Sequence, residues 1–83
     1  MDILEKIIEM FPEEEILSAD GFNDAIIGFD DSKGFVVLIY SVSKCLEILR
    51  SDMNEEDSME HFSYNVKGGY VGERTPIWCE DNF

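Results

Sequence analysis

Three side chains in this 83-residue sequence have the chemistry of catalytic groups: the single histidine, His61, and the two cysteines, Cys45 and Cys79. Acid–base catalysis by His61 would need a third group to orient the imidazole, and the neighbouring Glu60 is adjacent in sequence rather than on the same helical face. Cys45 falls on the apolar face of an expected helix, where a thiol is typically a small core residue. Cys79 has no predicted base beside it. The sequence therefore predicts a protein that is not an enzyme.

Nineteen carboxylates offer oxygen ligands for cations, but their order matches no binding loop. The acid-rich loops lack the ligand order of a calcium loop, and the sequence contains neither HExxH nor CxxC. Lys67-Gly68-Gly69 is a poor phosphate loop, because these glycines follow an expected helix and the negative end of a helix dipole repels anions. We expect no metal site and no cofactor, and we interpret Gly68-Gly69 as the stop of a helix.

The net charge of −13 is concentrated in two parts of the chain. Residues 1–31 carry ten acidic groups and one lysine, and residues 51–60 carry five acidic groups and no basic residue. Such a surface repels nucleic acid and anionic membranes and attracts basic partners. Six basic residues leave little counterion release to drive direct nucleic-acid binding. The alternative is that the charge serves solubility alone.

The length and composition are those of one folded domain spanning residues 1–83. Ten aromatic residues argue against disorder, although so short a chain would gain useful burial from a dimer interface. No run approaches the roughly 18 apolar residues of a membrane span, and the N-terminal MDILEKIIEMF has no basic region of a signal peptide. We expect a cytoplasmic protein with reduced thiols.

The first half of the chain predicts one helix followed by a β-hairpin. Apolar residues at helical spacing place the helix at 3–10, with Ile3, Leu4, Ile7, Ile8 and Phe11 on one face. The apolar runs 25–30 and 35–40 predict two antiparallel strands, and Asp31-Ser32-Lys33-Gly34 suits the loop between them. Because both runs are apolar at nearly every position, we expect helices on one sheet face and the C-terminal segment or a partner on the other.

The second half predicts two helices and a C-terminal extended arm, which makes the fold class α+β. The first helix, at 43–52, is capped by Ser41 or Ser43. The second, at 55–66, begins after Asn54 with three acidic residues in its first turn and has Met59, Phe62 and Val66 at helical spacing. The arm contains the turn-forming residues 72–76, and we expect Tyr70, Ile77 and Trp78 to cover the sheet.

Three segments in this order, YSVSKCLEIL, EEDSMEHFSYNV and GGYVGERTPIW, resemble a group of small uncharacterised bacteriophage and prophage proteins. The resemblance covers roughly half the chain, and its most specific part is Tyr-Val-Gly-Glu-x-Thr-Pro-Ile. It implies a phage origin, and small acidic phage proteins are often inhibitors of host enzymes or defence systems, sometimes as DNA mimics. No residue role comes with the resemblance.

These observations lead to two functional hypotheses. The first is a phage-encoded protein that inhibits a basic host protein, such as a nucleic-acid-handling or defence protein, by presenting its acidic surface to a basic groove. The contacts predicted for it are the carboxylates Glu13, Glu14, Glu15, Asp52, Glu55, Glu56 and Asp57, with Tyr70, Arg74 and Trp78 as secondary anchors. The second is a homodimer or other assembly module that uses the apolar sheet face and the C-terminal aromatic residues.

Overall fold

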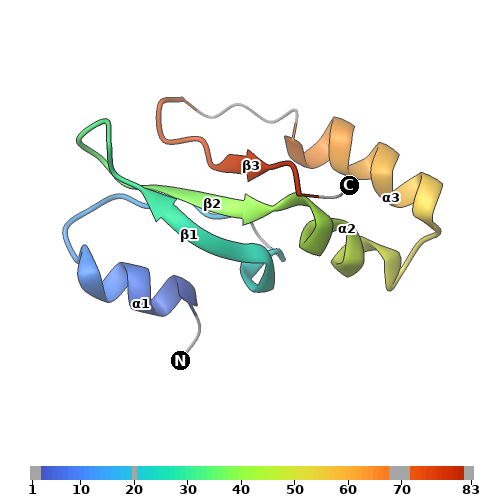
Figure 1. Cartoon of the computed structure of the whole chain (residues 1–83), viewed down its shortest axis with the longest axis horizontal. Coiled ribbons are helices and arrows are strands. Elements are labelled where there is room, and N and C mark those ends of the chain that lie inside the picture. Colours follow the sequence, from blue (N-terminus) through green and yellow to red (C-terminus); the bar gives the residue numbers. More distant parts are fainter. Residues whose placement is uncertain (1–2, 20, 68–71, 82–83) are drawn as a thin grey trace.

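The computed structural model describes residues 3–19, 21–67 and 72–81, and in this part of the chain three α-helices accompany a three-stranded sheet. Figure 1 shows how the helices lie beside the sheet. The predicted α+β class and the three helices are confirmed. The elements in chain order are the helix α1 (Ile3–Met10), the 3-10 turn η1 (Asn23–Ala25), the strands β1 (Ile26–Asp30) and β2 (Val37–Ser41), the helices α2 (Val42–Arg50) and α3 (Glu55–His61), the π-helical segment η2 (Phe62–Lys67) and the strand β3 (Ile77–Cys79).

The predicted hairpin is present, and its second strand lies slightly later in the chain than the apolar pattern indicated. β1 and β2 pair antiparallel, with Ile26 opposite Tyr40 and Phe29 opposite Leu38. The backbone N–H of Gly34 donates to the carbonyl of Asp31 at 3.1 Å, and Gly34 has a φ of +88° that glycine adopts without strain. The Asp31–Gly34 segment therefore forms the predicted turn.

The C-terminal arm extends the sheet instead of covering it. β3 pairs with β2 in parallel, so that the sheet order is β1-β2-β3 and β2 is central. A parallel pair needs a crossover between its strands, and α2 and α3 supply it. Trp78 lies beside Tyr40 in this register, so its ring stands on the same face as that of Tyr40. Our expectation that Ile77 and Trp78 cover the sheet was wrong on this point, while Tyr70 lies outside the described residues.

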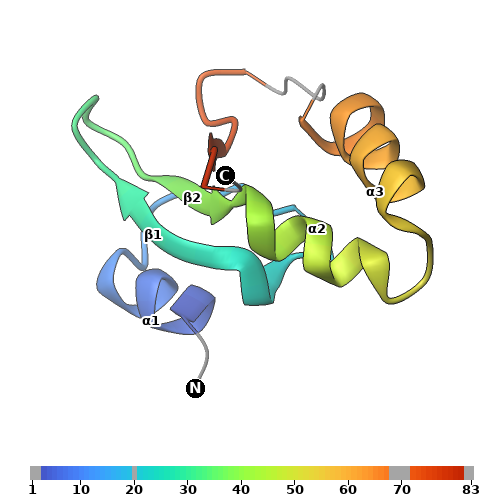
Figure 2. The same ribbon diagram turned by 45° about the vertical axis from the view of Figure 1, so that its right-hand side comes forward.

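The core lies on one face of the sheet, the face of Leu38 and Tyr40. The helices α1 and α2 contribute buried side chains to this core, and η2 adds Phe62 directly after α3. Figures 1 and 2 show α1 and the α2–α3 pair beside different parts of the sheet. The segment that follows α1 crosses the same face, where the backbone N–H of Ala19 donates to the Tyr40 hydroxyl at 2.7 Å. The buried residues of the core are Ile7, Phe22, Ala25, Ile26, Val36, Leu38, Tyr40, Val42, Cys45, Leu46 and Phe62.

The opposite face of the sheet carries a row of three isoleucines, one from each strand. An irregularity in β1 leaves both Ile27 and Gly28 opposite Ile39, and Ile39 is paired in turn with Ile77. Ile27 is 42% exposed and Ile77 is 40% exposed. Val37, which lies on the same face as Ile39, is only 5% exposed, so this side of the sheet is exposed at the isoleucines of its two edge strands and buried at Val37 in the central strand.

The helix caps follow local sequence signals. Ser41 begins α2, since its hydroxyl accepts from the Lys44 N–H at 3.2 Å, and this resolves the choice between Ser41 and Ser43. Asn54 begins α3, and its side chain accepts from the Asp57 N–H at 2.8 Å. The predicted stop at Gly68-Gly69 lies outside the described residues.

Two apolar side chains were expected to face inward and instead face solvent. The buried positions are Ser58 in α3 and, four residues later, Phe62 at the beginning of η2, whereas Met59 is 50% exposed. The Ser58 hydroxyl is accommodated because it donates to the Asn54 carbonyl at 2.8 Å. In α1 the buried residue is Ile7, and Ile8 is 47% exposed because it follows on the next position around the helix.

Candidate interaction surface

Glu13, Glu14 and Glu15, the first group of predicted contacts and here called the first acidic block, lie in a tight turn directly after α1. The N–H of Glu14 donates to the Phe11 carbonyl at 3.1 Å, which closes a turn that contains Pro12. Glu13 and Glu15 are exposed, whereas Glu14 is partly buried. Two of the three carboxylates in this turn are therefore available to a partner.

The third carboxylate, Glu14, is paired within the chain. Arg74 Nη1 lies 3.3 Å from Glu14 Oε2 and donates to the Glu15 carbonyl at 3.1 Å. The guanidinium carbon of Arg74 also lies 4.9 Å from the centre of the Phe35 ring. Arg74, which we predicted as a secondary anchor for a partner, thus connects the segment before β3 to the turn after α1.

The second predicted acidic block surrounds the beginning of α3. Asp52, Glu55, Glu56 and Asp57 are all exposed. Carboxylates in the first turn of a helix are stabilised by its partial positive charge, which explains how three of them are accommodated in succession. No lysine or arginine occurs between residues 51 and 66, and the nearest basic residue along the chain is Arg50, two positions before Asp52.

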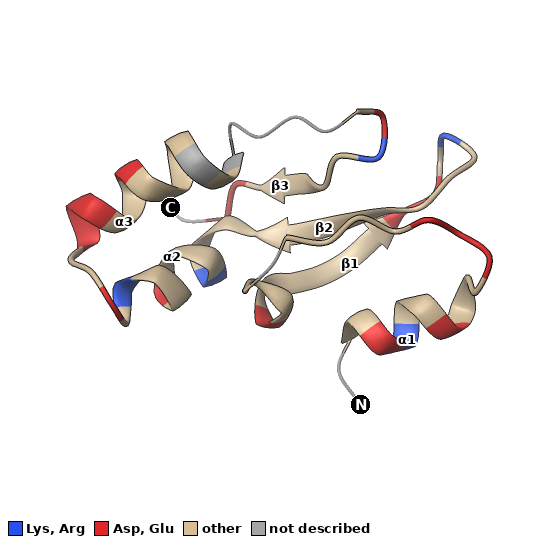
Figure 3. Ribbon diagram, turned by 180° about the vertical axis from the view of Figure 1, so that it is seen from behind, with Lys and Arg blue, Asp and Glu red and all other residues tan. Residues whose placement is uncertain are grey.

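The two acidic blocks lie toward opposite ends of the molecule. Figures 1 and 3 show the turn after α1 and the helix α3 separated along the longest axis, which extends over 39 Å. Figure 3 also shows acidic residues at both ends, with the sheet between them largely uncharged. A partner that contacts both blocks must therefore follow the length of the protein.

Trp78 is a packing residue and not an exposed anchor. Its ring lies 5.0 Å from that of Tyr40 and 5.4 Å from that of Phe62, measured between ring centres. The indole Nε1 is buried and has no hydrogen-bond partner in the described part of the chain. Tyr70, the other aromatic anchor predicted from the sequence, lies outside the described residues.

The three residues considered for catalysis are placed differently, and Cys79 is partly buried at the end of β3. Cys45 is fully buried in the core, and burial together with the nearby charge of Asp81 raises the pKa of its thiol to about 11. A thiol of this pKa is protonated at neutral pH, which fits the expected core role. His61 is half-buried in α3. No group of three metal-binding side chains occurs in the residues that the structure describes.

An interaction that the sequence did not reveal involves Asp81. Its carboxylate accepts from the Ser41 hydroxyl at 2.5 Å and from the Ser43 N–H at 2.9 Å. These hydrogen bonds lower the pKa of Asp81 and fix the chain after β3 to the first turn of α2. The partners are about 40 positions apart, and only the parallel pairing of β3 with β2 brings them together.

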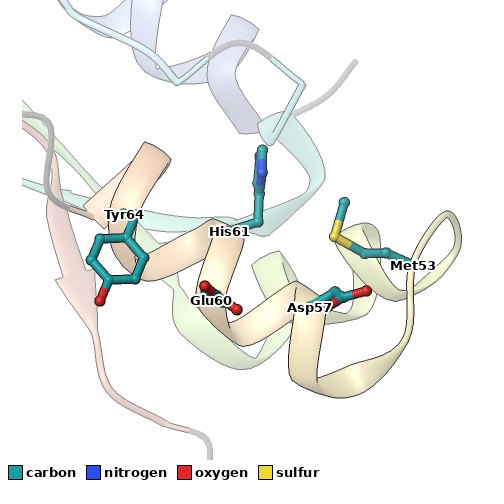
Figure 4. A pocket seen from close by; sticks show the side chains of 5 residues that line it. All are labelled: Met53, Asp57, Glu60, His61 and Tyr64. Carbon is teal, nitrogen blue, oxygen red and sulfur yellow. The ribbon is translucent and has the colours of Figure 1, made fainter.

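A second feature missed from the sequence is a shallow pocket on the outer side of α3. It has a volume of about 360 Å³ and is lined by Met53, Asp57, Glu60, His61 and Tyr64 (Figure 4). The alternation of acidic and apolar residues in this stretch is visible in the sequence. Which of these side chains lie together on the outer surface depends on how α3 is oriented against the rest of the fold.

Comparisons with protein family models, with curated proteins and with solved structures find no match for this chain. The helices of the described residues are also too short or too polar to cross a membrane. The placement of charged and aromatic side chains on the surface therefore carries the structural part of the functional proposal.

Proposed function

We propose that this protein is a non-enzymatic binding protein whose acidic surface occupies a basic groove of a partner protein. The observation that carries the proposal is the placement of two exposed carboxylate blocks at opposite ends of a molecule 39 Å long. This length is close to one turn of B-DNA, about 34–36 Å, and a duplex likewise presents negative charge along its length. A groove that binds nucleic acid has the complementary charge and extent.

The partner that we propose is a host nucleic-acid-handling or defence protein, and the protein itself is a phage-encoded inhibitor acting in the host cytoplasm. Support for this assignment comes from the resemblance to small phage proteins and from the net charge of −13. Opposite charges on the two surfaces would accelerate association and make it sensitive to salt. Inhibition follows by competition, because the acidic protein and the nucleic acid need the same groove.

The experiment is capture of bacterial proteins on the immobilised protein at low salt, followed by elution with a short DNA duplex. We expect at least one DNA- or RNA-binding protein to be retained and then displaced by the duplex. A matched column carries the Glu55→Lys/Glu56→Lys variant and should retain much less of the same protein. Retention that neither the duplex nor the charge reversal reduces would contradict the proposal.

A second candidate function is a homodimer or assembly module, and the isoleucine row on the sheet face opposite the Tyr40 core favours it. Ile27, Ile39 and Ile77 form a continuous apolar strip across three strands. If this strip joins two copies, the wild-type protein sediments as a dimer and an Ile77→Lys variant as a monomer. A monomeric wild-type protein would exclude this function.

A further inference from the structure

The outer side of α3 is a concave surface made by one stretch of chain. Asp57, Glu60 and His61 come from α3, and Glu60 and His61 lie three and four positions after Asp57, on the same side of the helix. Met53 comes from the turn before α3, and Tyr64 from η2 after it. Figure 4 shows Glu60 between Tyr64 and Asp57, with Met53 at the far side. The pocket volume of about 360 Å³ is at the lower end of the range for ligand sites, about 300–1,000 Å³.

This side of α3 is largely in contact with solvent, because Asp57, Glu60 and Tyr64 are exposed, whereas Met53 and His61 are partly buried. The helix is attached to the rest of the protein through the buried Ser58 and through Phe62, the residue that follows its last turn. Tyr64 is 78% exposed, which is the highest exposure among the large apolar or aromatic residues described as exposed. A single exposed aromatic ring is ordinary on a protein surface, so it is the position of Tyr64 in a pocket with Asp57 and Glu60 that suggests a binding role.

The charges around the tyrosine define the chemistry of an occupant. Asp57 and Glu60 both line the pocket, and residues 51–66 include no lysine or arginine. The face of a tyrosine ring attracts cations, and carboxylates form strong hydrogen bonds with charged donors. A guanidinium group suits this combination better than an ammonium group, because it is planar, stacks on aromatic rings and pairs with a carboxylate through two N–H groups.

We propose that this pocket receives an arginine side chain of the partner protein. The inference rests on the proposed function and adds to it a specific anchoring site at the α3 end. The arginine stacks on Tyr64 and donates to Glu60 and Asp57, while the other exposed carboxylates act through longer-range attraction. Tyr64 therefore supplies specificity for arginine, which charge alone does not provide.

The test uses the intact protein and three short peptides, acetyl-Gly-Arg-Gly-amide and its citrulline and lysine analogues, followed by NMR at low salt. Citrulline keeps the shape of arginine without its charge. We expect the arginine peptide to shift the resonances of Asp57, Glu60 and Tyr64 and to bind more tightly than the other two. Equal binding of the citrulline or lysine peptide would overturn the proposal.

Variants separate a local site from general charge attraction. Tyr64→Ala should weaken arginine binding by a factor of about two to five, the range expected for a cation over an exposed ring, and Tyr64→Phe should retain it. Glu60→Gln should weaken binding, whereas Glu13→Gln removes the same charge at the other end of the molecule and should leave it unchanged. Equal effects of Glu60→Gln and Glu13→Gln would contradict a local site. Because Tyr64 is so exposed, thermal unfolding should show that these variants remain folded.

The outcomes for this site and for the proposed function are distinguishable. The peptide titration needs no partner, so arginine binding at α3 without any DNA-displaceable partner would refute the proposed function alone. A captured partner that is released by charge reversal at Glu55 and Glu56 but binds the Tyr64→Ala variant as tightly as the wild type would refute the arginine site alone.

Discussion

At the scale of single residues, Asp81 connects the C-terminal end of the described chain to the core. Its carboxylate accepts hydrogen bonds from Ser41 and Ser43, at the positive end of α2. Removal of the charge in Asp81→Asn should lower the melting temperature at neutral pH. Glu47→Gln, an exposed change of equal charge on the same helix, should have little effect.

The stabilisation by the Asp81 carboxylate should depend on pH, and its direction follows from the lowered pKa of this group. The hydrogen bonds lower the pKa of Asp81 below its ordinary value of 3.8, so the folded state favours the charged carboxylate. The stabilisation is complete above that ordinary value and is lost as the pH falls through the folded-state pKa. The difference in melting temperature between wild type and Asp81→Asn should thus be constant near neutrality and shrink in acid below about pH 4. A difference that grew in acid would contradict the assignment.

At the scale of elements, α3 is attached to the sheet through an aromatic contact. Phe62 is buried and its ring meets the Trp78 ring edge-on. Phe62→Ala should cost about 3–5 kcal/mol in the free energy of unfolding, measured by denaturant titration. It should also shift the fluorescence of Trp78, the single tryptophan, to longer wavelength as water reaches the ring. Met59→Ala, an exposed change on the same helix, is the control and should leave both quantities nearly unchanged.

The elements also show what the sequence could predict. The hairpin and the helix starts depend on local signals, such as the turn at Gly34 and the caps at Ser41 and Asn54, and these were predictable. The parallel pairing of β3 was not, because three residues carry too little pattern to define a partner strand. The orientation of α3 was not predictable, because the buried position is taken by a polar residue, Ser58. Its hydroxyl donates a hydrogen bond to the Asn54 carbonyl.

The candidate surface was predictable in composition but not in arrangement. The two acidic blocks are visible in the sequence, since charge runs are typically solvated. Their separation along the molecule depends on the whole fold, and so does the pairing of Arg74 with Glu14 across about 60 positions. The α3 pocket likewise required the helix orientation, which no local pattern supplied.

At the scale of the whole molecule, the central claim is that carboxylates at both ends act together on one partner. The two blocks are separated along a 39 Å axis, so each should contribute on its own to the attraction. Charge reversal at either end should then weaken binding and make it less dependent on salt. Reversing the charge of the same number of acidic residues outside the blocks should weaken binding only by changing the net charge of the protein.

The most direct measurement is therefore the affinity of a captured partner at several salt concentrations for four proteins. These are the wild type, Glu13→Lys/Glu15→Lys, Glu55→Lys/Glu56→Lys and the control Asp24→Lys/Glu47→Lys, in which exposed acids outside the blocks are reversed. The account predicts that either block variant loses at least about tenfold in affinity at low salt and has a shallower salt dependence, while the control loses far less. Equal losses in all three variants, or none in the block variants, would contradict it.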